Sequence, residues 1–183
     1  MSVIFESERL IIRGSDMEYL DAIFSYYREN RDFFERYEPE QGDTYYTREY
    51  QEKLLEFEVK NMERGSSLYF YYSLKEDPER VIGSISFSRL RKEPYASTVF
   101  GYNIHEKYQG HGYCTEACAA SMEKLFQDYD MHRIESRVLP DNLKSINVLL
   151  RLGFFCEGFE KESILIGGKF RDHLRYAYIN EDY

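Results

Sequence analysis

The stretch from Lys107 to Ala117 constrains this 183-residue chain more than any other part of it. It reads Lys-Tyr-Gln-Gly-His-Gly-Tyr-Cys-Thr-Glu-Ala and lies between an apolar alternation over 96–104, which predicts a strand, and a segment over 115–129 that predicts a helix. Gly110 and Gly112 have no Cβ, so they allow a turn whose backbone N–H groups point to one place. The helix start adds unpaired N–H groups and a partial positive charge. The junction therefore predicts a site for a phosphate or pyrophosphate.

Known phosphate loops differ in the residues around such glycines. A Walker A loop needs Gly-Lys-Ser/Thr before the helix, and this stretch has no such triplet. A dinucleotide-binding loop needs a third glycine, but Thr115 stands at that position. An acyl-CoA loop of the pattern Gln/Arg-x-x-Gly-x-Gly/Ala is the third possibility. An ordinary tight turn remains the alternative for two glycines taken alone.

The rest of the chain predicts a mixed α/β sheet in one domain over 1–183. Strands are predicted over 8–13, 68–74, 81–89, 96–104, 133–139, 154–166 and 172–179. Helices are predicted after a capping box from Ser15 to Glu18, and over 47–64, 115–129 and 144–152. The second of these helices is expected to turn Leu54, Phe57 and Val59 inward. The predicted core is Leu10, Ile12, Leu20, Phe24, Ile85, Phe87, Leu125, Phe126, Ile134, Val138, Val148 and Phe154.

Composition excludes several classes of function. The net charge is −9, which argues against sequence-independent binding of DNA or RNA, because that needs basic surface to neutralise phosphates. The acidity is compatible with an amine-bearing acceptor. No signal pattern or membrane-spanning run is found, so we expect a cytoplasmic protein without a membrane partner. Cys114, Cys118 and Cys156 lack zinc-site spacing and are expected to be reduced packing residues, with no metal.

A second motif in the C-terminal half supports the interpretation of the glycine loop as an acyl-CoA loop. Asn142-Leu143-Lys144-Ser145 is followed by a predicted helix, Leu152-Gly153-Phe154 and Glu157-Gly158. Together with the glycine loop, this order resembles the GCN5-related N-acetyltransferases (GNAT), and most closely the branch of ribosomal-protein N-terminal acetyltransferases. The resemblance covers nearly the whole chain. Lys107 departs from the Gln/Arg that opens the family's loop motif.

The resemblance implies a GNAT fold, with a mostly antiparallel sheet of about seven strands and flanking helices. It also implies a splayed strand pair that holds acetyl-CoA as co-substrate. The residues expected to bind acetyl-CoA are Asn103, Ile104, Gln109, Gly110, His111, Gly112, Tyr113, Cys114, Thr115, Asn142 and Ser145. The acceptor pocket is expected to include Tyr37, Glu38, Tyr102 and Asp172.

Proton transfer is where this chain departs from many relatives. Many of these enzymes carry an acidic tyrosine seven residues after the asparagine, but Leu149 stands there. In the ribosomal-protein branch a serine takes that place, which points to Ser145 as the acid. The base is open among Glu157, Glu162, Asp172 and, less well, Glu38, whereas His111 is expected to face solvent.

The predicted function is acetyl transfer from acetyl-CoA to a primary amine, foremost the N-terminal α-amino group of a protein such as a ribosomal protein. The alternatives are acetylation of a small amine, such as an aminoglycoside, a polyamine or an amino-acid derivative, and acyl-CoA binding without turnover. No nucleic-acid partner is expected, and a monomer and a homodimer are both compatible with the sequence.

Overall fold

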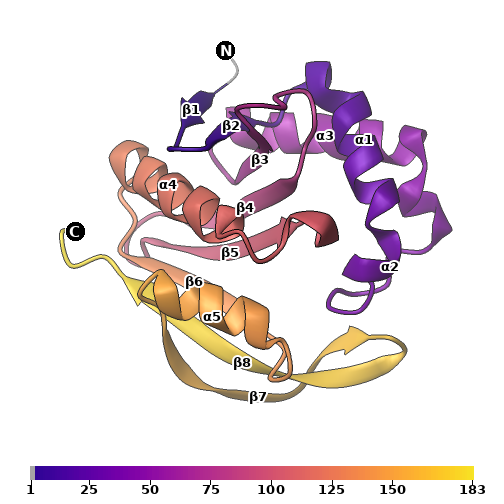
Figure 1. Ribbon diagram of the computed structural model, residues 1–183. Coiled ribbons are helices and arrows are strands. Elements are labelled where there is room, and N and C mark those ends of the chain that lie inside the picture. The colour runs from indigo at the N-terminus through magenta and orange to yellow at the C-terminus, as the bar shows by residue number, and fades with distance from the viewer. Residues whose placement is uncertain (1–2) are drawn as a thin grey trace.

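The computed structural model describes residues 3–183, which form one eight-stranded sheet in the order β1-β2-β3-β4-β5-β6-β8-β7 (Figure 1). The strands are β1 (Ile4–Glu6), β2 (Leu10–Gly14), β3 (Leu68–Leu74), β4 (Gly83–Arg91), β5 (Ser97–Ile104), β6 (Arg133–Val138), β7 (Phe155–Ile166) and β8 (Lys169–Ile179). The predicted mixed, mostly antiparallel sheet is confirmed. Strand β1 is additional to the predicted seven, because three residues are too short to show an alternation.

Strands β5 and β6 form the parallel pair of this sheet, and they separate along their length. Paired positions run only from Ser97 opposite Arg133 to Val99 opposite Glu135. Strand β5 continues to Ile104, so its last residues have lost their β6 partner. The predicted splay is therefore present. It leaves an open edge of strand in the middle of the sheet.

Helices cover both faces of the sheet (Figure 1). They are α1 (Leu20–Glu29), α2 (Arg31–Phe34), α3 (Arg48–Glu63), α4 (Tyr113–Asp128) and α5 (Leu143–Arg151), with short 3₁₀ turns at Met17–Tyr19, Asp43–Tyr46 and Glu106–Tyr108. The predicted capping box is wrong. The cap is Asp16, whose side chain accepts from the Glu18 N–H (3.0 Å), while Ser15 is buried and its hydroxyl donates to Glu58.

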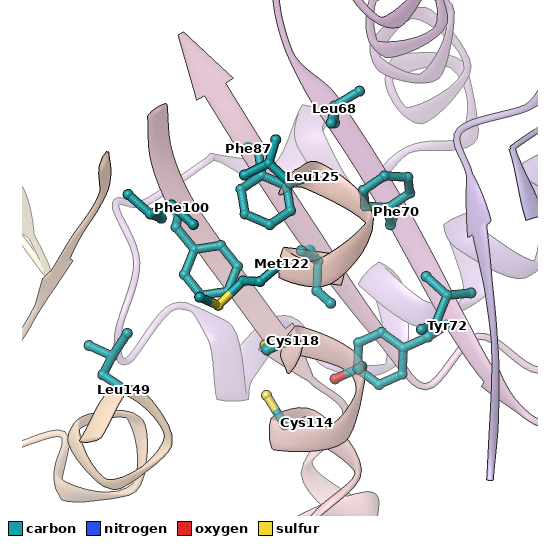
Figure 2. Close-up of a cluster of buried hydrophobic side chains, with 14 of the residues drawn as sticks. Leu68, Phe70, Tyr72, Phe87, Phe100, Cys114, Cys118, Met122, Leu125 and Leu149 are labelled. Carbon is teal, nitrogen blue, oxygen red and sulfur yellow. The ribbon is translucent and has the colours of Figure 1, made fainter. Parts of the chain in front are cut away.

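The face under α4 is an apolar core. Figure 2 shows Phe70, Phe87 and Phe100 of the sheet beneath Met122 and Leu125 of α4. Phe87 stacks on Phe100 with ring centroids 5.0 Å apart. All predicted core residues are buried except Phe24, Phe126 and Val148, which are half-buried.

The opposite face is covered by α1, α2 and α3 and has a different composition. Its buried cluster is Leu20, Ile23, Tyr26, Tyr27, Phe34, Tyr46, Leu55, Tyr71 and Val81. The predicted inward face of α3 is wrong: Phe57 is 56% exposed, and the buried residues of this helix are Gln51, Leu55 and Glu58. The reason is that this side of α3 meets polar groups: Glu58 accepts from the Tyr71 hydroxyl (3.1 Å), and Gln51 donates to the Tyr45 backbone carbonyl (2.7 Å).

The three cysteines differ in their burial. Cys114 and Cys118 are free and buried beside Tyr72 (Figure 2), but Cys156 is exposed and is not a packing residue. Within residues 3–183, no helix has both the length and the apolar content to cross a bilayer.

Candidate active site

The glycine loop joins the end of β5 to the start of α4, as the sequence predicts. Gly110 and Gly112 have φ angles of +83° and +81°, a region that side chains other than glycine avoid. Gly112 is the N-cap of α4, and the first hydrogen bond of the helix runs from the Glu116 N–H to the Gly112 carbonyl (3.0 Å). The N–H groups of Tyr113, Cys114 and Thr115 precede that bond, so the helix start can bind an anion.

Arg9 and Glu116 hold this loop in place. The Arg9 guanidinium donates to the His111 carbonyl (3.0 Å) and pairs with Glu116 (2.6 Å), and it lies 4.5 Å from the centre of the Tyr113 ring. Burial alone would raise the pKa of Glu116, but hydrogen bonds from Ser7 and Arg9 hold it below its ordinary value. The turn between β1 and β2 is therefore tied to the loop, a role that the sequence did not reveal for either residue.

A cavity of about 440 Å³, here called the loop cavity, opens in front of the loop. Of the predicted cofactor residues, the loop cavity is lined by Asn103, Ile104, Gln109, Gly110, Gly112, Tyr113, Cys114, Thr115, Asn142 and Ser145. Helix α5 adds Lys144 and Arg151 to the lining, and the Lys144 ammonium donates to the Gln109 side chain (2.6 Å). Backbone N–H groups and two cations therefore face the same space.

The open edge of β5 forms a wall of the loop cavity. The His105 N–H donates to the Ile82 carbonyl on the β4 side (2.8 Å). Because N–H groups alternate along an extended strand, the Ile104 N–H points to the opposite edge, toward the gap left by β6. Asn142 faces this gap as the N-cap of α5, and its side-chain amide oxygen accepts from the Ser145 N–H (3.2 Å).

Ser145 forms a hydroxyl pair with Tyr102 at the mouth of the gap. The two hydroxyl oxygens are 2.8 Å apart, and the Tyr102 hydroxyl also lies 3.0 Å from the Ser145 carbonyl. Tyrosine has one hydroxyl proton, so Tyr102 donates to the carbonyl and Ser145 donates to Tyr102. Burial raises the pKa of Tyr102, so its hydroxyl stays protonated. Leu149 is fully buried one turn further along α5, so it leaves this place to the hydroxyl pair.

A second cavity of about 370 Å³, here called the sheet cavity, lies over the α1–α3 face of the sheet. It meets the loop cavity at residues that line both: Tyr37, Tyr102, Asn103, Asn142 and Ser145. Glu38 lines the sheet cavity and accepts a 2.5 Å hydrogen bond from the Asn103 side chain. Burial raises the pKa of Glu38, although this hydrogen bond opposes the shift. A carboxylate with raised basicity thus lies where the two cavities join.

The structure does not bring the other predicted acidic residues to either cavity. Glu157 is paired with Arg133 and with Arg175 (3.6 Å), and the Arg133 hydrogen bond lowers its pKa. Glu162 is exposed at an irregular position of β7, where its N–H donates to the Asp172 carboxylate (2.7 Å). None of these three side chains lines either cavity.

His111 also lies outside both cavities. It is exposed, as predicted, and stacks on the Tyr113 ring with centroids 5.5 Å apart. Only the backbone of His111 is therefore expected to contact acetyl-CoA.

One buried carboxylate in the sheet cavity was missed from the sequence. Glu58 of α3 is 5% exposed and accepts hydrogen bonds from Ser15 (2.7 Å) and Tyr71 (3.1 Å). The available signal was in β3, where Tyr69, Tyr71 and Ser73 alternate with Leu68, Phe70 and Tyr72. A strand that is apolar on one face and rich in hydroxyls on the other indicates a second, polar layer.

Comparison with known proteins agrees with this geometry. The acetyltransferase (GNAT) domain family matches residues 9–155. The chain is 33% identical over 154 residues to the probable N-acetyltransferase YjcK of Bacillus subtilis, covering 84% of each protein. It is 29% identical over 178 residues to the [ribosomal protein uS5]-alanine N-acetyltransferase of Escherichia coli, covering 97% of this chain and 91% of that enzyme.

A solved structure is also similar over almost the full length. It is the ribosomal-protein-S5-alanine acetyltransferase of Vibrio fischeri, with a TM-score of 0.94, 29% identity, and coverage of 99% of this chain and 98% of that one.

Proposed function

Since the chain belongs to the GNAT acetyltransferase family, and so transfers an acetyl group from acetyl-CoA to an amine, we propose that its acceptor is the N-terminal α-amino group of a protein. Two similar proteins, from Escherichia coli and Vibrio fischeri, are named for acetylating an alanine of a ribosomal protein. A ribosomal protein is therefore the first acceptor to test.

The meeting of the two cavities is the observation that carries this proposal. A transferase with two substrates needs two spaces that share a reaction point. The loop cavity has free backbone N–H groups and two cations, which fit the phosphates of CoA. The sheet cavity has carboxylates and hydroxyls, which fit an amine. Tyr102, Asn103 and Ser145 line both spaces and so mark the point where the reactants meet.

The residues present fit acetyl-CoA. Its phosphates would lie on the N–H groups of Gly112 to Thr115 with Lys144 and Arg151 nearby, and Asn142 would hold the pantetheine amides. The bound molecule supplies an activated acetyl group as a thioester. The Ile104 N–H, which faces the gap, would donate to the acyl oxygen as negative charge develops there.

Two proton transfers complete the reaction. An N–C bond forms and a C–S bond breaks, the amine loses a proton and the thiolate gains one. We assign the first proton to Glu38, directly or through water, because its carboxylate lies at the junction and burial raises its basicity. Ser145 would protonate the thiolate and regain a proton from water, and the Tyr102 hydroxyl, which stays protonated, would hold the serine hydroxyl in place through their 2.8 Å contact.

The choice of an α-amino group follows from its acidity. The reference pKa of an α-amino group is about 7.7–8.0 and that of a lysine side chain about 10.4, so only the first is substantially neutral near pH 7. A weak base such as Glu38 therefore suffices for an N-terminus more readily than for a lysine.

The test is acetylation of matched peptides with an N-terminal alanine and one internal lysine. We expect thiol release from acetyl-CoA with the free peptide, and mass spectrometry should place the acetyl group on the α-nitrogen. The peptide with a blocked N-terminus should give no release. Transfer only to lysine or to small amines would contradict the acceptor, and binding of acetyl-CoA without transfer to any amine would contradict catalysis.

A further inference from the structure

The floor of the sheet cavity is a small polar patch formed by three neighbouring strands. Strand register places Tyr71 opposite Ser84, and Ser84 opposite Asn103. The next row on the same face is Tyr69, Ser86 and Gly101. Residues that pair directly point to the same side of a sheet, so these two rows form one surface of hydroxyl, amide and backbone groups.

Two carboxylates lie over opposite ends of the first row. Glu38 contacts Asn103 at one end (2.5 Å), and Glu58 contacts Tyr71 at the other (3.1 Å). Neighbouring strands are about 4.8 Å apart, so Asn103 and Tyr71 are separated by about 10 Å across β4. Glu38 is next to the reaction point, whereas Glu58 is at the far end of the same cavity.

Glu58 has no cationic partner among residues 3–183. Its oxygens accept only from the hydroxyls of Ser15 and Tyr71. The charged groups that share the cavity do not compensate it, since Arg137 is paired with Glu160 (2.8 Å) and burial lowers the pKa of His173. Burial raises the pKa of Glu58 to about 7.

A buried carboxylate without a cation is costly unless it binds a proton or a positively charged ligand. The position of Glu58 matters for this reason: it lines a substrate cavity, where a ligand can bring the missing charge. A carboxylate that served only to tie α3 to β3 would not need to reach that cavity.

We propose that Glu58 binds a second positive charge of the acceptor, a lysine or arginine side chain within the first few residues after the N-terminus. This inference rests on the proposed function and narrows it to acceptors with a basic residue near the reacting amine. Glu38 receives the reacting amine and Glu58 the basic side chain, at the two ends of the row from Asn103 to Tyr71.

The test compares peptides with an N-terminal alanine that differ only by lysine or the neutral norleucine at position 2, 3 or 4. For the full chain we expect kcat/KM to favour lysine by about tenfold or more at one position. In Glu58→Gln the amide oxygen still accepts from Ser15 and Tyr71, so the fold is retained, and this preference should fall to near one. Glu56→Gln, an exposed change on the same helix, should keep it.

Other outcomes separate this inference from the proposed function. Acetylation of lysine and norleucine peptides with equal kcat/KM at every position, or a preference that survives in Glu58→Gln, would overturn the inference and leave the proposed function intact. If no peptide is acetylated, the proposed function fails, and calorimetric titration of the CoA-saturated protein with spermidine decides the cation site alone. Tenfold weaker binding of spermidine to Glu58→Gln would support the site, and equal or undetectable binding would overturn it.

Discussion

The two faces of the central sheet are built from different kinds of side chain. Under α4 the sheet presents Phe70, Phe87 and Phe100, which pack against aliphatic side chains of the helix (Figure 2). Under α1 and α3 it presents Tyr71, whose hydroxyl donates to the buried Glu58. The three phenylalanines are enclosed by apolar side chains, whereas Tyr71 borders the sheet cavity. The difference indicates that stability is concentrated under α4 and that acceptor recognition is concentrated under α1–α3.

The largest expected effect is on the α4 face. Phe87 is fully buried and stacked on Phe100, so Phe87→Ala should lower the free energy of unfolding by about 3–5 kcal/mol. Phe57→Ala, on the exposed side of α3, should change it by less than about 0.5 kcal/mol. Denaturant unfolding of both variants gives the comparison. A Phe57→Ala variant as unstable as Phe87→Ala would mean that α3 packs with the other face inward.

The next effect is on the α1–α3 face and has the opposite sign. The pKa of Glu58 is raised from 4.5 to about 7 in the folded protein, chiefly by burial. Between these values the folded state binds more protons than the unfolded state, so the contribution of Glu58 to stability is full below pH 4.5 and is lost as pH rises through 7. The loss is on the order of 3 kcal/mol.

Glu58→Gln should therefore be more stable than the natural chain at pH 8 and nearly equal to it at pH 4.5. The difference in unfolding free energy between the two proteins, measured at both pH values, cancels the titration of all other groups. The exposed Glu56→Gln should show no such pH-dependent difference. A Glu58→Gln variant that is less stable at pH 8 would show that the carboxylate stabilises the fold as an anion.

The smallest expected change in stability is in the glycine loop. Gly112 and Gly168 both have positive φ, +81° and +71°, so alanine at either position should cost about 1 kcal/mol. Only Gly112→Ala should also lower the affinity for CoA, because only this residue positions the N–H groups at the start of α4. Calorimetry with CoA distinguishes the two variants. If both variants bind CoA with the same affinity, the glycine loop does not form the phosphate site.

The difference between the two faces of the sheet also explains which parts of the fold could be predicted from the sequence. The glycine loop and most of the apolar core depend on local rules of backbone and periodicity, and the structure has both where the sequence predicts them. The face of α3 could not be predicted in that way. Gln51 and Glu58 read as solvent-facing until the tyrosines of β3 are known to lie opposite them.

The acidic residues of the C-terminal hairpin show the limit of motif reasoning. Glu157, Glu162 and Asp172 are close to the second motif in sequence, but their orientation is set by Arg133 and by an irregular stretch of β7. Which carboxylate reaches the reaction point depends on the tertiary packing of the loop after α2, where Glu38 lies. No periodicity in the sequence encodes that contact.

Steady-state kinetics of Ser145→Ala tests the central claim, that the two cavities join at the Ser145–Tyr102 pair. Because this serine is assigned to the departing thiolate, the loss should be confined to turnover. We expect kcat to fall about 10²-fold, the low end of general-acid effects, since a thiolate leaves readily even without protonation. CoA affinity, measured by calorimetry on the same variant, should be almost unchanged. A variant with the natural kcat, or one whose whole defect is weaker CoA binding, would contradict the account.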